Sequence, residues 1–145
     1  MAFLTSSWQI WAILAALFAA ATAILAKIGV DSIAPDLATL IRTVVVAVLL
    51  TGLVLATGQG RGLGAIAPRS WLFLTLSGFA TGASWLCYFR ALKLGPASQV
   101  APIDKLSVVF VALLGVAFLG ERLSLTAWTG IGLITAGAVL VAVGN

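Results

Sequence analysis

The 145 residues are 62% hydrophobic and only 8% charged, with a mean hydropathy of +1.20, whereas roughly a quarter of the residues in ordinary soluble domains are charged. A globule of this size leaves much of its surface exposed and cannot hide so many apolar side chains, which excludes a water-soluble fold and makes lipid the solvent. The net charge of +4 comes from eight scattered Lys and Arg residues, without the basic face expected of a nucleic-acid-binding protein.

The apolar residues fall into five runs, each long enough for a helix that crosses the roughly 30 Å hydrocarbon core. Trp8 begins the first run at a position suited to a membrane interface, and Lys27 lies near the end of that run. The segment 57–70 is the longest connection, and Gly95-Pro96 separates the third run from the fourth. The expected helices cover about 8–28, 37–56, 71–92, 97–119 and 125–143.

Segments of alternating polarity, which a membrane β-barrel would require, are absent from the sequence. We therefore predict an all-α integral membrane protein with five transmembrane helices, in which residues 1–145 form a single domain of the plasma (inner) membrane.

Asp31 and Asp36, between the first two runs, are candidate helix caps. With no histidine and one cysteine, Cys87, the sequence has neither a metal-ligand cluster nor a nucleophile beside a base, so we expect neither an enzyme nor a cofactor.

Four ionisable residues lie inside the predicted spans, namely Arg42, Arg90, Asp104 and Lys105. Such groups cost several kcal/mol in lipid, so they usually face the interior of a helix bundle and often mark a pathway. On a continuous helix the adjacent side chains of Asp104 and Lys105 diverge by about 100°, so each is expected to have its own partner. We expect Asp104 to pair with Arg90 or Arg42, which leaves Lys105 for a substrate, a carbonyl or water. The alternative is that these charges are structural, or that their side chains extend to the membrane interface, since Asp104 and Lys105 lie only about two turns into their helix.

Hydroxyl and amphipathic aromatic side chains recur at spacings of three and four in the third run, at Ser77, Thr81, Ser84, Trp85 and Tyr88. This face is suited to lining a cavity, although hydroxyls also bind neighbouring helices, and Gly78 and Gly82 favour close helix packing. In the fourth run Pro102 frees a carbonyl one turn earlier, and membrane binding sites are often built at such breaks. The candidate substrate-binding residues are Trp85, Tyr88, Asp104 and Lys105, with Arg42 and Arg90 as their charge partners.

Several motifs carry a resemblance to a known family. They are Ala91-Leu92 through Gly95-Pro96-Ala97-Ser98 and Ala101-Pro102, then Phe118-Leu119-Gly120-Glu121-Arg122-Leu123, then Trp128-Thr129-Gly130. The Ala-rich first run, which ends in Ala26-Lys27-Ile28-Gly29, fits the same pattern. Over essentially its whole length the chain resembles one five-helix EamA unit of the drug/metabolite transporter superfamily.

Typical members of that family carry two such units in one chain with inverted topology, which gives ten helices around a central substrate pathway. The resemblance therefore implies that this unit is one half of a ten-helix inverted-repeat transporter and that another molecule supplies the second half. The last run also resembles the dimerising helix of the related small multidrug resistance proteins, which implies a dimer interface at Gly130, Leu133, Ile134 and Gly137. Those proteins couple transport to protons through a glutamate in the first helix, and this first run has no carboxylate.

Basic residues in short loops set the orientation of a membrane protein, so a chain that inserts both ways should show little bias. With Arg42 and Lys105 set aside as embedded, the count is three on one side (Lys27, Arg90 and Lys93) and three on the other (Arg61, Arg69 and Arg122). Moving the two embedded residues to their nearest interface would make it five against three.

We predict a secondary transporter that exports a small polar or amphipathic metabolite or drug by alternating access, as an antiparallel dual-topology homodimer. Coupling to a proton or another ion is left open. The alternative is a membrane scaffold or accessory subunit that stabilises another membrane protein without moving a substrate.

Overall fold

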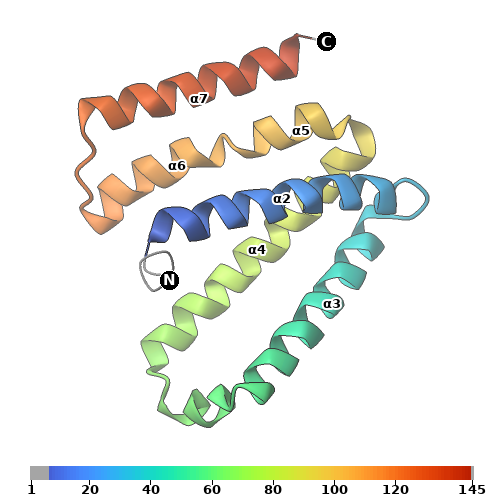
Figure 1. The fold of residues 1–145 in the computed structure, drawn as a ribbon, viewed down its shortest axis with the longest axis vertical. Helices are drawn as coiled ribbons and strands as arrows, with labels where there is room; N and C mark the ends of the chain where they lie inside the picture. Colours follow the sequence, from blue (N-terminus) through green and yellow to red (C-terminus); the bar gives the residue numbers. More distant parts are fainter. Residues whose placement is uncertain (1–6, 145) are drawn as a thin grey trace. The chain divides into compact units, whose positions relative to one another are not determined.

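The computed structural model describes residues 7–144, and this part of the chain is helical apart from short turns (Figure 1). The ends of the predicted domain, residues 1–6 and 145, lie outside the described residues. The elements in chain order are α2 (Trp8–Val30), α3 (Pro35–Ala56), the 3₁₀ segment η1 (Gln59–Ala65), α4 (Pro68–Leu94), α5 (Ala97–Asp104), α6 (Ser107–Leu114), the π-helical turn η2 (Gly115–Leu119) and α7 (Leu125–Val143).

Five stretches of the described chain are long and apolar enough to cross a membrane. Four of them are α2, α3, α4 and α7, and the fourth in chain order, Ala97–Leu119, combines α5, α6 and η2. The all-α fold with five spans, predicted from the lengths of the apolar runs, is therefore confirmed.

The second and third spans begin at prolines, two and three residues before the expected starts at 37 and 71. A proline fits the first turn of a helix because its φ is already helical and its missing N–H has no partner there. The cap of α3 is Ala34, which makes no side-chain hydrogen bond. The expectation that Asp36 caps this helix is wrong, because Asp36 lies inside the first turn and binds a residue of α4 instead.

The chain divides into two compact units, one of which is Leu25–Lys93. It contains the end of α2, then α3, η1 and α4, with α3 and α4 joined as a hairpin through η1 (Figure 1). Gly58 before η1 has a φ of 69°, a left-handed conformation that glycine adopts without strain. Val30 and Leu92 are fully buried in this unit, so its core lies where the end of α2 meets the end of α4.

The other unit combines the chain up to Ile24 with the chain from Leu94 onward. Here α7 packs along α5 and also contacts α6. The side of α7 that carries the buried Ala138 and the half-buried Ile131 and Thr135 is the packed one. Ser124 caps α7, since its hydroxyl accepts a 3.2 Å hydrogen bond from the backbone N–H of Ala127.

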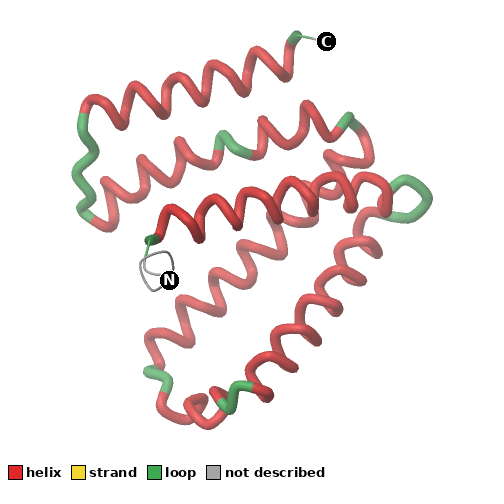
Figure 2. The backbone as a smooth tube through the Cα atoms, in the orientation of Figure 1, coloured by secondary structure: helices red, strands yellow, loops and turns green. Residues whose placement is uncertain are grey.

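The fourth span is broken near its middle, where Figure 2 shows a short turn between α5 and α6. Pro102 lies in the last turn of α5 and has no N–H to donate. Beyond it the backbone tightens: the N–H of Lys105 donates to the carbonyl of Pro102 at 3.1 Å, and the N–H of Leu106 to that of Ile103 at 3.0 Å. This span is therefore a discontinuous helix, with Asp104 and Lys105 at the break.

Little of any span is buried within the described chain: between 6% and 17% of the most apolar window of each. Large apolar side chains such as Phe79, Leu125 and Leu133 are more than 70% exposed. In a membrane these surfaces must face lipid or another protein chain.

Candidate functional site

The most distinctive polar feature of the unit Leu25–Lys93 is an arginine of α3 that lies over aromatic rings of α4. The guanidinium carbon of Arg42 is 4.1 Å from the centroid of the Trp85 ring and 5.7 Å from that of Phe89. Trp85 and Phe89 are four residues apart, so they share one face of α4. Tyr88 lies close enough for an electrostatic interaction with Arg42. The structure thus brings together three sequence-predicted site residues, Arg42, Trp85 and Tyr88.

Arg42 is half-buried and lies about two turns after the start of α3. Within residues 7–144 its guanidinium has no hydrogen-bond acceptor and no carboxylate partner, and its interactions are those with the aromatic side chains just described. An arginine that is positioned but not neutralised is suited to meet a ligand.

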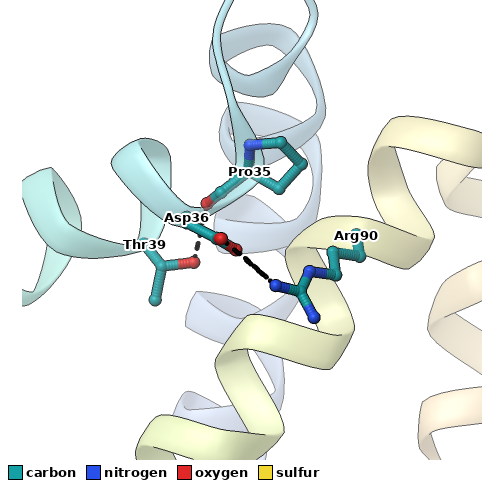
Figure 3. A network of polar contacts seen from close by, with 4 residues as sticks. All are labelled: Pro35, Asp36, Thr39 and Arg90. Carbon is teal, nitrogen blue, oxygen red and sulfur yellow. Dashed lines mark hydrogen bonds and ion pairs between the residues drawn. The ribbon is translucent and has the colours of Figure 1, made fainter.

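The second cation of this region, Arg90, is neutralised within the chain. Its Nη2 donates to both carboxylate oxygens of Asp36 at 3.1 Å, and both side chains are about 60% exposed. Figure 3 shows the Asp36 carboxylate of α3 pointing toward the Arg90 guanidinium of α4, beside Thr39, whose hydroxyl donates to the carbonyl of Pro35 at 2.9 Å. Within this unit the partner of Arg90 is therefore Asp36. The expected pairing of Arg90 or Arg42 with Asp104, a residue of the other unit, stays a prediction.

Two lysines hold the ends of α2 and α4 together, because each donates hydrogen bonds to backbone carbonyls at the end of the other helix. Lys27 of α2 donates to the carbonyl of Leu92 at 2.7 Å, and Lys93 of α4 donates to the carbonyls of Val30 at 2.9 Å and of Asp31. The last carbonyls of a helix lack partners within it, and a lysine there also suits the helix dipole. These hydrogen bonds therefore hold in place the end of α4, where Phe89 and Arg90 lie.

In the other unit, Lys105 Nζ binds Asp104 Oδ2 at 3.1 Å. The expectation that these adjacent side chains diverge and take separate partners is wrong, because the helix ends at Asp104 and the two residues lie at a break. Within the described chain Asp104 is half-buried and Lys105 is exposed.

One hydroxyl of the face of α4 that was predicted to line a cavity is bonded within its own helix: Thr81 donates to the carbonyl of Ser77 at 2.9 Å. The neighbouring face forms an open, apolar groove along this single helix, lined by Thr75, Gly78, Phe79, Gly82, Ala83 and Leu86. Trp85 and Tyr88 do not line this groove, so the small residues and the aromatic cluster occupy different sides of α4.

The four residues predicted for a dimer interface lie away from the packed side of α7. Leu133 is 74% exposed and Ile134 50% exposed, Gly137 is exposed and Gly130 is half-buried. At 100° per residue they form one stripe beside the face that packs on α5. That stripe does not contribute to the packing of α7 on α5.

Sequence reasoning missed Phe89, Asp36, Lys27 and Lys93 as parts of this region. Phe89 was not singled out from the sequence, although its i, i+4 spacing from Trp85 was a usable signal. Among the described residues, no group of three His, Cys, Asp or Glu side chains could hold a metal ion.

Comparison with known proteins gives a consistent result. The model of the EamA-like transporter family matches residues 6–143. The "uncharacterized transporter in cobO 3'region" of a Sinorhizobium species is 59% identical over 140 residues, which cover 97% of this chain and 99% of that protein. No solved structure matches the chain.

Proposed function

Because the chain belongs to the EamA-like transporter family, and is thus a multi-pass membrane transporter and not an enzyme, we propose that it exports a small polar or amphipathic metabolite or drug. The observation that carries this proposal is the placement of Arg42 over Trp85. A cation held on aromatic faces inside a membrane-spanning hairpin provides charge and shape for a solute, and lipid-facing packing has no need of it.

The broken fourth span supports alternating access as the mechanism. Transporter sites are typically built where spanning helices are discontinuous, because freed backbone groups and polar side chains can line the pathway there. Asp104 and Lys105 lie at the break between α5 and α6, and in this proposal they bind solute or ion.

Alternating access needs two halves that move against each other, and in this proposal an antiparallel homodimer supplies them. The relative from Sinorhizobium, described as an uncharacterized transporter, aligns over 99% of its own length with this chain and so has the same one-unit size. In this proposal the stripe of Gly130, Leu133, Ile134 and Gly137 on α7 supplies an interface with small residues, which lets helix backbones approach closely.

Solute counterflow into proteoliposomes tests the proposal. The purified chain would be assayed with labelled amino acids, organic acids, nucleobases, amines and lipophilic cations. We expect at least one solute to accumulate above the level of protein-free liposomes. Trp85→Ala should remove most of that flux, whereas Trp71→Ala, a tryptophan at the opposite end of the same helix, should retain it. Absence of flux for every solute would favour the scaffold role.

A further inference from the structure

We propose that Arg42 binds an anionic group of the transported solute, so that the substrates are small organic anions bearing a carboxylate, phosphate or sulfonate. This inference rests on the transport function proposed above and narrows its substrate class. The juxtaposition that carries it is a guanidinium fixed on Trp85 and Phe89 with no acceptor of its own among residues 7–144.

A guanidinium that stacks on an aromatic ring uses its face and keeps the N–H groups at its edge. Those donors match the two oxygens of a carboxylate or phosphate, with which they form paired, charge-assisted hydrogen bonds. Trp85 and Phe89 therefore position Arg42 for an oxyanion without consuming its hydrogen-bonding capacity.

The neighbouring cations differ from Arg42 in this respect. Arg90 has the carboxylate of Asp36, whereas Lys27 and Lys93 have backbone carbonyls. Arg42 alone of these four makes neither a hydrogen bond nor an ion pair to an oxygen within the described chain. A cation without a counter-ion is costly inside a membrane span, so a ligand that supplies the missing oxyanion is stabilised there.

The surrounding charge has the sign that an anion requires. Besides Arg42, the junction of α2, α3 and α4 carries three basic residues (Lys27, Arg90 and Lys93) and two acidic ones (Asp31 and Asp36), a balance of 3 − 2 = +1. A cationic solute would be repelled at this place, which opposes the lipophilic cations that the drug class includes.

Binding of a matched set of phenyl compounds tests the inference. Phenylacetate, phenyl phosphate and benzenesulfonate carry an anionic group on the same ring, phenylacetamide is neutral and phenethylamine is cationic. Affinities would be measured calorimetrically with the full chain in phosphatidylcholine nanodiscs at neutral pH. We expect at least one anion to bind about tenfold more tightly than the neutral and cationic compounds.

Three variants assign that preference to one residue. Arg42→Gln should abolish the preference for anions, and Arg42→Lys should weaken it, because an ammonium lacks the planar fork of a guanidinium. Arg69→Gln is the matched control, since Arg69 also lies over an aromatic ring, 5.7 Å from Phe73, but near the start of α4. This control should retain the preference.

The inference is overturned if none of the anions binds, if the neutral or cationic compound binds equally well, or if Arg42→Gln keeps the preference. A lipid headgroup offers the same phosphate chemistry, so the chain would also be titrated with phosphatidylglycerol. An Arg42-dependent effect of that lipid without any effect of the soluble anions overturns the substrate assignment.

Counterflow separates this inference from the transport function. Arg42-dependent binding of an anion that is never transported would contradict transport and leave the anion site standing. Transport of amines or neutral solutes alone, unaffected by Arg42→Gln, would contradict the anion site and leave transport standing.

Discussion

The Arg42 guanidinium of α3 lies 4.1 Å from the centre of the Trp85 ring of α4. This contact joins two spanning helices through a cation and a π-system, an interaction worth about 0.5–2 kcal/mol according to its exposure. It places the charge of Arg42 at a defined point along the hairpin and so links the packing of α3 and α4 to the proposed binding of solute.

A double-mutant cycle between these two residues should reveal that coupling. Trp85→Leu removes the π-face but keeps apolar bulk, and Arg42→Gln removes the charge. Each single change should weaken solute binding, and the double variant should lose about 2- to 30-fold less than the product of the two losses. Trp85→Phe should retain most of the affinity. Strictly multiplicative losses in calorimetric titrations would indicate that the ring does not position the guanidinium.

The lysines that cross between α2 and α4 should contribute mainly to stability. Lys93→Met leaves the carbonyls of Val30, Asp31 and Ile33 without their ammonium donor, and hydrogen bonds to charged groups contribute about 1.5–3 kcal/mol. We expect a clearly lower thermal unfolding midpoint in detergent. Arg61→Met removes a basic residue from η1 and should leave the midpoint nearly unchanged. Equal midpoints for the two variants would show that Lys93 is dispensable for packing.

Asp104 lies at the break in the fourth span, where it is paired with Lys105. Asp104→Asn should abolish or strongly reduce counterflow while the unfolding midpoint stays within a few degrees of the unmodified chain, because the side chain keeps its size and the pair is solvent-accessible. Normal counterflow by Asp104→Asn would make Asp104 a structural residue.

The interface proposed on α7 can be tested with glycines of one helix. Gly137→Leu adds bulk to the stripe that includes Leu133, whereas Gly132→Leu adds the same bulk to a different face. Neither glycine has a neighbour within 4 Å of an added Cβ, so both variants should fold. We expect light scattering in detergent to report about one 14.9 kDa chain for Gly137→Leu and two for Gly132→Leu. Dimers of both variants would place the interface elsewhere.

The number and order of the spans could be predicted from the sequence because lipid requires about 20 apolar residues for each crossing. A weak point of the fourth span near Pro102 could be predicted as well, because a proline has no N–H to donate, although the turn itself lies after Asp104. Both properties are local, so they can be recognised without knowing which helices are neighbours.

The pairing of charges could not be obtained in this way. Asp36 was interpreted as a cap because it follows a loop, but its partner Arg90 is 54 residues away and is reached only when α3 and α4 are brought together. Asp104 and Lys105 were expected to take separate partners on a continuous helix, but α5 ends at Asp104 and the two side chains bind each other. Long-range partners depend on tertiary structure, which a single sequence does not contain.

If two inverted copies of this chain form one transporter, the chain must insert into the membrane in both orientations. A single cysteine would be introduced as Gly62→Cys in η1, in a Cys87→Ser background, and labelled in intact cells with a membrane-impermeant maleimide. We predict that about half of the chains react before permeabilisation and the rest only afterwards. Labelling of all chains, or of none, before permeabilisation would contradict the antiparallel dimer.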